Sequence, residues 1–94
     1  MSEHVFWIAK GTIKPGQLDN FKALMDEMVA ATPADEPGAL NYEWFVSQDG
    51  TQCHIYERYA DSAAAMTHAV NFGKFAERFL AVLEPGGMMV YGNP

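Results

Sequence analysis

The sequence predicts an α+β domain of the ferredoxin-like type, in which helices cover one face of a four-stranded antiparallel sheet. Alternating apolar residues mark strands near the start, in the middle and at the end of the chain. Apolar residues at helical spacing follow the first strand and the third. Asp49-Gly50 separates the two central strands and predicts a hairpin. The expected order is β-α-β-β-α-β with the second helix split, in a single domain over residues 1–94.

The first strand is expected at residues 4–14. One face carries Val5, Trp7, Ala9 and Ile13, and the other carries Phe6, Ile8 and Thr12. Pro15-Gly16 ends this strand, because proline fixes φ and lacks a donor. The apolar spacing then becomes helical from residue 17 to residue 31. The helix face that predicts core packing consists of Leu18, Phe21, Leu24, Met25 and Met28.

The central hairpin follows a loop expected at residues 32–38, which Pro33 and Pro37 should stiffen. Its strands are expected at about 39–48 and 51–60, joined by a two-residue primed turn at Asp49-Gly50. On the second strand, Leu40, Tyr42, Trp44 and Val46 share one face, and Ala39, Asn41, Glu43, Phe45 and Ser47 the other. On the third, Cys53, Ile55, Glu57 and Tyr59 alternate with Gln52, His54, Tyr56 and Arg58.

Asp61 is a typical N-cap for the second helix, because its carboxylate can accept an N–H of the first turn. Gly73 should break this helix, which is expected to resume at about Lys74. The second half should place Phe75, Phe79, Val82 and Leu83 in the core. We expect Gly86-Gly87 to form a turn after the helix, and residues 88–91 to form a short last strand.

Both faces of the predicted sheet carry large apolar or aromatic side chains. An antiparallel sheet with one solvated face normally shows polar residues on that face in every strand. We therefore expect the face away from the helices to be covered, most simply by a second copy of the chain.

The composition excludes several classes of function. A net charge of −6 argues against binding to nucleic acid or to an anionic membrane surface. There is no basic N-terminal region and no apolar run long enough for a membrane span, so we expect a cytoplasmic protein. Cys53 is the single cysteine and is expected to be a small core residue. With three scattered histidines it makes no zinc-type spacing, so no metal site is predicted.

Several segments together resemble the antibiotic biosynthesis monooxygenase domain, whose family includes small bacterial quinol monooxygenases. The segments are Lys14-Pro15-Gly16, Gly38-Ala39-Leu40-x-Tyr42, Ile55-Tyr56-Glu57-Arg58-Tyr59, Asp61-x-x-Ala64-x-x-x-His68 and Phe72-Gly73-x-Phe75. The resemblance implies a homodimeric α/β barrel, in which two sheets face each other and a cavity lies between each sheet and its helices. It also implies oxidation of a small phenolic or quinol-like substrate by O₂ without a metal, flavin or other cofactor.

Such a reaction requires a base, because a deprotonated phenol is electron-rich enough to pass an electron to O₂. His68 is the first catalytic candidate, since imidazole titrates near neutral pH and the residue matches the family's Ala-x-x-x-His. The alternative is a structural histidine that bonds to a strand or caps a loop. Glu57, on the inward face, is the second catalytic candidate as a proton acceptor. Its alternative is a structural ion pair with an arginine or a lysine.

Six further residues are candidates for substrate binding: Tyr42, Trp44, Tyr56, Arg58, Trp7 and Asn41. Tyr56 and Arg58 share a face, where they either hold an aromatic anion or belong to the dimer interface. Tyr42 and Trp44 are either pocket walls or ordinary core. Trp7 and Asn41 are included because tryptophan and asparagine are functional in family members, including relatives that degrade heme.

Three functions stay open from the sequence. The first is a cofactor-independent monooxygenase acting on a small aromatic quinol or phenol. The second is a non-catalytic dimeric module that binds a small apolar molecule. The third is a heme-degrading relative in which His68 ligates iron. The sequence supports a pocket more directly than it supports a reaction, so it leaves open whether the protein is an enzyme.

Overall fold

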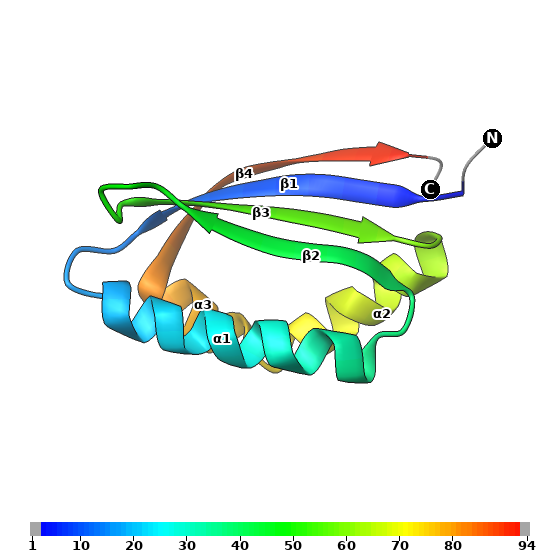
Figure 1. Cartoon of the computed structure of the whole chain (residues 1–94), viewed down its shortest axis with the longest axis horizontal. Helices are drawn as coiled ribbons and strands as arrows, with labels where there is room; N and C mark the ends of the chain where they lie inside the picture. The colour runs from blue at the N-terminus through cyan, green and yellow to red at the C-terminus, as the bar shows by residue number, and fades with distance from the viewer. Residues whose placement is uncertain (1–2, 93–94) are drawn as a thin grey trace.

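The computed structural model describes residues 3–92 and shows one four-stranded sheet with helices packed against one face (Figure 1). The strands are β1 (Val5–Ile13), β2 (Ala39–Val46), β3 (Gln52–Tyr59) and β4 (Leu83–Gly92), and the helices are α1 (Leu18–Asp35), α2 (Ser62–Phe72) and α3 (Ala76–Val82). The strand order is β2-β3-β1-β4, with every neighbouring pair antiparallel and the sheet not closed. This confirms the ferredoxin-like order and the split second helix.

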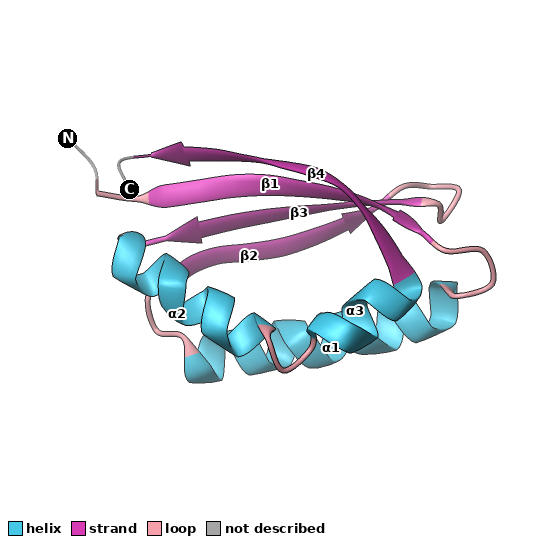
Figure 2. Ribbon diagram, turned by 180° about the vertical axis from the view of Figure 1, so that it is seen from behind, coloured by secondary structure: helices cyan, strands magenta, loops and turns pink. Residues whose placement is uncertain are grey.

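The core lies between the helices and the inner face of the sheet (Figure 2). Its buried apolar side chains are Ile13, Phe21, Leu24, Met28, Cys53, Ile55, Phe79, Val82 and Leu83. The helical face predicted for α1 and the alternation predicted for β1 and β3 are therefore confirmed. Apolar side chains recur along each element at the spacing that places them on one face. Burying these faces against one another stabilises the strands and helices and determines how they pack.

The start and the break of the second helix also follow the sequence. The Asp61 carboxylate accepts the N–H of Ala64 at 2.8 Å, which confirms the predicted N-cap. α2 ends at Phe72, directly before Gly73, and α3 begins at Ala76. No helix in the described part of the chain is long and apolar enough to cross a membrane.

Two boundaries differ from the prediction. α1 continues to Asp35, into the segment expected to be a stiff loop, because the N–H of Glu36 still donates to the carbonyl of Thr32 at 2.9 Å. β4 begins at Leu83, so Gly86-Gly87 lies within a strand and not in a turn. The pairing of β4 with β1 shifts register between Lys10 and Gly11, and Gly87 has a φ of 114°. These glycines therefore permit an irregularity in an edge strand.

The hairpin differs from the prediction in two places. Asp49 does not have a positive φ, whereas Gly50 has a φ of 73°, so the turn is not a two-residue primed turn. It is a longer loop, in which the Asp49 carboxylate accepts hydrogen bonds from Ser47 and Thr51. The pairing of β2 with β3 also shifts between Ala39 and Asn41. Leu40 is consequently exposed and does not join Tyr42 and Trp44 in the interior.

The outer face of the sheet is apolar, as expected. The Phe6 ring stacks on the Tyr91 ring at 4.9 Å, and the Arg58 guanidinium lies 4.5 Å from the centre of the Phe6 ring. Ile8, Phe45 and Met89 are large apolar side chains that remain exposed in the single chain.

Gly11 offers a test of how closely β4 packs on β1. A Cβ added at Gly11 would lie 2.5 Å from Leu83 Cδ2, in the buried core. We expect Gly11→Ala to lower the free energy of unfolding by about 1–3 kcal/mol, because overpacking forces its neighbours off their rotamers. Urea denaturation measures this change. The control is Gly86→Ala on β4, whose Cβ would come no closer than 3.5 Å to any neighbouring atom. Equal stability of the two variants would contradict the packing described.

Candidate active site

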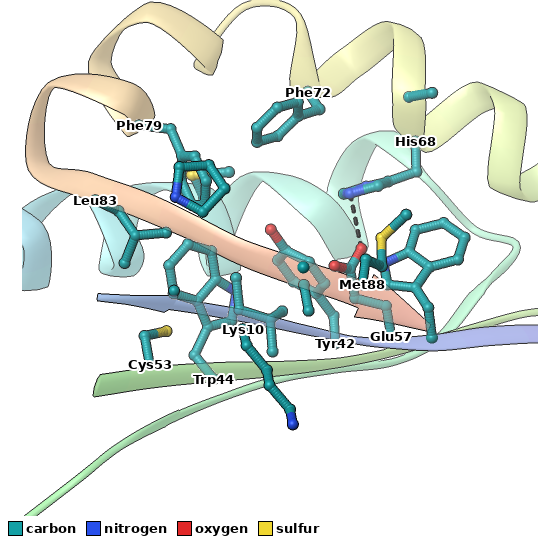
Figure 3. Close-up of a pocket in the computed structure, with 18 residues that line it drawn as sticks. Lys10, Tyr42, Trp44, Cys53, Glu57, His68, Phe72, Phe79, Leu83 and Met88 are labelled. Carbon is teal, nitrogen blue, oxygen red and sulfur yellow. Dashed lines mark ion pairs between the residues drawn. The ribbon is translucent and has the colours of Figure 1, made fainter. Parts of the chain in front are cut away.

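A cavity of about 430 Å³ lies between the inner face of the sheet and helices α2 and α3 (Figure 3). Its volume falls in the range of small-molecule sites. Aromatic and aliphatic side chains form most of the lining, including Phe72 and Phe79 from the helices and Leu83 and Met88 from β4. Lys10 contributes only its stem, because its ammonium group points away from the cavity.

His68 is held between two carboxylates at the wall of this cavity. Its Nε2 lies 2.9 Å from Glu57 Oε1 on β3, and its Nδ1 lies 2.9 Å from Glu36 Oε1, directly after α1. The exposed fractions are 4% for Glu36, 5% for Glu57 and 7% for His68. The Tyr59 hydroxyl donates to the same Glu57 Oε1 at 2.7 Å. We call Glu36, His68 and Glu57 the carboxylate–imidazole triad.

The hydrogen bonds of the triad bear on its charge. If both carboxylates are ionised, each imidazole nitrogen must carry a proton to form its hydrogen bond. Burial lowers the pKa of His68, but the hydrogen bonds and negative charges of Glu57 and Glu36 outweigh that effect and raise it overall. With both carboxylates ionised, the triad holds an imidazolium between them and carries one net negative charge. His68 has no free lone pair with which to take a proton from a substrate.

Glu57 is the member of the triad whose free oxygen borders the cavity, because Glu36, whose Oε2 likewise has no donor among the described residues, does not line it. Both of its hydrogen bonds, from His68 and Tyr59, go to Oε1. In the part of the chain that the structure describes, no donor contacts its Oε2. Because Glu57 also lines the cavity, it is the group that can accept a proton from a bound molecule.

Aromatic rings surround the imidazole and complete the site. Tyr59, Tyr42 and Trp7 have ring centres 5.2, 5.3 and 6.2 Å from that of His68. Burial, followed by the negative charge of Glu57, raises the pKa of Tyr42, so its hydroxyl keeps its proton and is a donor. Burial also raises the pKa of the Cys53 thiol to about 11, which fits the small core residue expected from the sequence.

The structure gathers five of the eight predicted site residues around this cavity: Trp7, Tyr42, Trp44, Glu57 and His68. Asn41, Tyr56 and Arg58 do not line it. Tyr56 and Arg58 lie on the outer face, where Arg58 Nε donates to the Tyr56 hydroxyl at 3.0 Å. In a single chain none of these three reaches the cavity, so a substrate-binding role for them has no support from its geometry.

Sequence reasoning missed Glu36 and the hydrogen bond from Tyr59. Glu36 lies in a proline-containing segment without apolar periodicity, so nothing in a single sequence indicates its burial. The structural alternative for Glu57 is an ion pair with an arginine or a lysine. Its partner is instead His68, and Arg78 pairs with the exposed Glu27 at 2.7 Å. Within residues 3–92 no group of three or more histidine, cysteine, aspartate or glutamate side chains is arranged to hold a metal ion.

The triad predicts that the free energy of unfolding depends on pH and that Glu36→Gln reduces this dependence. A raised pKa in the folded state means that the His68 contribution to stability is complete below about pH 6.5 and is lost as pH rises through the folded pKa. Glu36→Gln removes one negative charge but keeps an acceptor for Nδ1–H. We expect the pKa of His68 to fall, which an NMR titration of its ring protons measures.

The free energy of unfolding provides the companion measurement. Between neutral and alkaline pH, the native chain should lose more stability than Glu36→Gln does. Glu27→Gln is the matched control, because Glu27 lies in an exposed ion pair away from the triad. An unchanged pKa of His68 in Glu36→Gln would refute the charge assignment.

Comparisons with known proteins agree with this architecture. The family model described as antibiotic biosynthesis monooxygenase matches residues 5–78. MupZ from Pseudomonas fluorescens has 26% identity and a TM-score of 0.88, over 98% of this chain and 70% of that chain. Rv0793 from Mycobacterium tuberculosis has 24% identity and a TM-score of 0.82, over 97% and 95% of the two chains.

A mutant of SnoaB, described as a cofactor-independent oxygenase from Streptomyces nogalater, has 17% identity and a TM-score of 0.79, over 98% of this chain and 94% of that chain. At this identity the likeness shows the fold alone. No curated protein matches the sequence. The family match spans most of the chain, from β1 into α3. The chain therefore belongs to the antibiotic biosynthesis monooxygenase family.

Proposed function

We propose that this protein is a cofactor-independent monooxygenase that oxidises a small aromatic quinol or phenol with O₂. The observation that carries the proposal is a buried carboxylate, Glu57, which presents a free oxygen to an aromatic cavity. Membership of the family supports it. So does the likeness in fold to SnoaB, which is itself described as a cofactor-independent oxygenase.

In the proposed reaction, the hydroxyl of a bound phenol donates its proton to Glu57 Oε2. The phenolate that forms is electron-rich and reduces O₂ directly, so the substrate supplies all the electrons. When a phenol becomes a quinone, one oxygen atom of O₂ forms the new carbonyl. The other leaves as water with the hydroxyl hydrogen and one ring hydrogen, so the equation balances with O₂ as the only co-reactant.

The rest of the triad supports Glu57 as a base. The His68 imidazolium and the Tyr59 hydroxyl hold Glu57 Oε1, which leaves the other oxygen aimed at the cavity. When Glu57 gains a proton, the Nδ1 proton of His68 can move to Glu36, 2.9 Å away, so the added charge spreads over the triad. The walls of the cavity are mostly apolar, and such surroundings strengthen each electrostatic interaction within. His68 and Glu36 are thus positioning residues in this scheme.

The heme-degrading alternative fits this geometry poorly, because both nitrogens of His68 are occupied by carboxylates and no lone pair is left for iron. The non-catalytic binding module needs only the cavity. Oxygen consumption separates it from the monooxygenase, since a binding module would bind an aromatic ligand without consuming O₂.

We also propose that the protein is a homodimer in which the outer faces of two sheets meet, as the family resemblance implies. Met89 lies on that face and is 61% exposed in the single chain. Phe6, Tyr56 and Arg58 form a connected aromatic and cationic cluster on the same face, a composition typical of interfaces.

The proposed base is tested by oxygen uptake with a naphthoquinol, after subtraction of the uncatalysed oxidation. Glu57→Gln keeps the size of the side chain but removes the base, so kcat should fall by about 10²–10⁴-fold. Glu27→Gln, which alters an exposed carboxylate elsewhere, should leave kcat unchanged. Circular dichroism checks that both variants fold. If the native protein consumes no O₂ with any quinol or phenol tested, the monooxygenase proposal fails.

The dimer is tested by light scattering of two matched variants. Met89→Glu places a charge on the outer face of the sheet and should convert the dimer to a monomer, because an unpaired charge would be buried in the interface. Met66→Glu on α2, where Met66 is 65% exposed, should leave the dimer intact. A native protein that is monomeric at micromolar concentration would exclude the proposed interface.

A further inference from the structure

A second cavity, of about 40 Å³, lies between the end of α1 and the break that separates α2 from α3. We call it the small cavity, and the aromatic one the main cavity. Thr32 and Glu36 line it on the α1 side, and Asn71 and Lys74 line it on the other. Lys74 is exposed, so the small cavity reaches the surface. A cavity needs only about 10–15 Å³ and a few polar partners to hold a water molecule, so the small cavity suits water.

The carboxylate–imidazole triad lies between the two cavities. Glu57 lines the main cavity but not the small one, whereas Glu36 lines the small cavity but not the main one. His68 joins the two carboxylates through its two nitrogens, each 2.9 Å from a carboxylate oxygen. Figure 3 shows the Glu57 side of this connection. The two ends of the triad therefore face different surroundings, a ligand at Glu57 and water at Glu36.

Glu36 keeps one oxygen available on the side of the small cavity. Its Oε1 is bonded to His68, and no described residue donates to its Oε2. Oε2 is also not sealed from solvent, because among residues 3–92 the one buried side-chain nitrogen or oxygen without a partner is Trp44 Nε1. Water in the small cavity can therefore reach Glu36 Oε2.

We propose that the small cavity is a proton exit, through which Glu36 passes a proton from the triad to solvent while a substrate occupies the main cavity. The inference rests on the proposed function and assigns Glu36 a positioning and relay role, since this residue does not touch the substrate. A second route is useful because a ligand beside Glu57 Oε2 takes the place of the water that would otherwise exchange protons with that oxygen.

The transfer balances proton by proton. The phenol gives its hydroxyl proton to Glu57 Oε2, and the phenol oxygen keeps the electron pair. His68 gives its Nδ1 proton to Glu36, and rotation of that carboxyl group presents the proton to water in the small cavity. One proton has then entered the triad and one has left, so its net charge is unchanged. Glu57 is protonated, Glu36 is ionised again, and the His68 ring is neutral with its proton on Nε2.

The charges of the triad favour this order of transfers. Burial lowers the pKa of His68, and among the influences that raise it the hydrogen bond and negative charge of Glu57 come first. Protonation of Glu57 removes that negative charge, so His68 holds its second proton less firmly. Glu36 remains 2.9 Å from Nδ1 as the acceptor. The proton therefore leaves on the side away from the substrate.

The exit would prolong the electron-rich state of the substrate. The reaction as a whole releases no proton, but the phenol must stay ionised until O₂ accepts an electron, and the reduced oxygen takes up protons only later. After the exit, return of the Glu57 proton to the substrate would leave two buried carboxylates beside a neutral imidazole. Such an uncompensated charge is costly, so the return is opposed.

The test measures how fast the two ring protons of His68 exchange with water, by ¹⁵N NMR of the ligand-free protein. Ala31 lines the small cavity, and Ala31→Val places two more methyl groups there. We expect the exchange of Nδ1–H to slow by at least about tenfold, because it would then require a local opening at the end of α1. The exchange of Nε2–H, on the Glu57 side, should not change.

Ala30→Val is the matched control, because the same substitution at the next position of α1 falls on an exposed residue outside the small cavity. It carries the same loss of helix propensity and should leave both exchange rates unchanged. Asn71→Leu is the second variant if Ala31→Val does not fold. It replaces a polar group of the lining with an apolar side chain of similar size and should also slow Nδ1–H.

Oxygen uptake with a naphthoquinol measures whether turnover uses the exit. In Ala31→Val, kcat should fall by about tenfold while KM stays the same, because the small cavity does not contact the substrate. Ala30→Val should keep the native kcat and KM.

Two results would overturn the proton exit. The first is an exchange rate of Nδ1–H that is no slower in Ala31→Val and Asn71→Leu than in Ala30→Val. The second is a native kcat in Ala31→Val despite slowed exchange, since turnover would then not use this route.

The failures of the two proposals are distinguishable, because the exchange measurement needs no substrate. If Ala31→Val slows Nδ1–H but no quinol or phenol supports oxygen uptake, the monooxygenase falls and the connection of the triad to solvent stands. If oxygen uptake depends on Glu57 but Ala31→Val changes neither the exchange nor kcat, the monooxygenase stands and the proton exit falls.

Discussion

The carboxylate–imidazole triad is the interaction on which the site depends, because it joins three separate parts of the fold. Glu36 follows α1, Glu57 lies on β3 and His68 lies on α2. A buried ion pair gains little net stability, since desolvation of the charges offsets their attraction. Removing one partner is another matter, because it leaves an uncompensated buried charge and costs about 3–5 kcal/mol. The triad therefore holds α2 in one position over the sheet, and that position defines one wall of the cavity.

The local structure around the triad is consistent with this constraint. Asp61 caps the start of α2. In the first turn of α2, Ala64 packs so closely on Gly38 that a Cβ added at Gly38 would lie 2.6 Å from the Ala64 Cβ. At the other end of α2, the break at Gly73 separates it from α3. Phe72 and Phe79 meet edge to face across this break at 5.2 Å between ring centres. The helices thus form an aromatic roof above the sheet, and the space beneath them is left open.

Much of the fold was predictable because it depends on the period of apolar residues. The faces of β1, β3 and α1 and the cap at Asp61 each follow from local pattern and chemistry. The predictions that are wrong concern residues whose structural role differs from the commonest role of their residue type. Asp49 is a hydrogen-bond acceptor in its loop and does not supply a positive φ, and Gly87 lies in a bent edge strand and not after a helix. Glu36 was unpredictable because its burial depends on a residue 32 positions away in the sequence.

The triad also changes which residue is assigned as the base. From the sequence, His68 is attractive because a free imidazole titrates near neutral pH. Two buried carboxylates raise its pKa and occupy both of its nitrogens, so it cannot act on a substrate directly. The same contacts leave Glu57 with one oxygen bound and the other facing the cavity. Loss of the His68 ring would therefore alter folding as well as chemistry, because two carboxylates would be left buried without a positive charge between them. The imidazole determines where the basic oxygen lies, and the carboxylate performs the proton transfer.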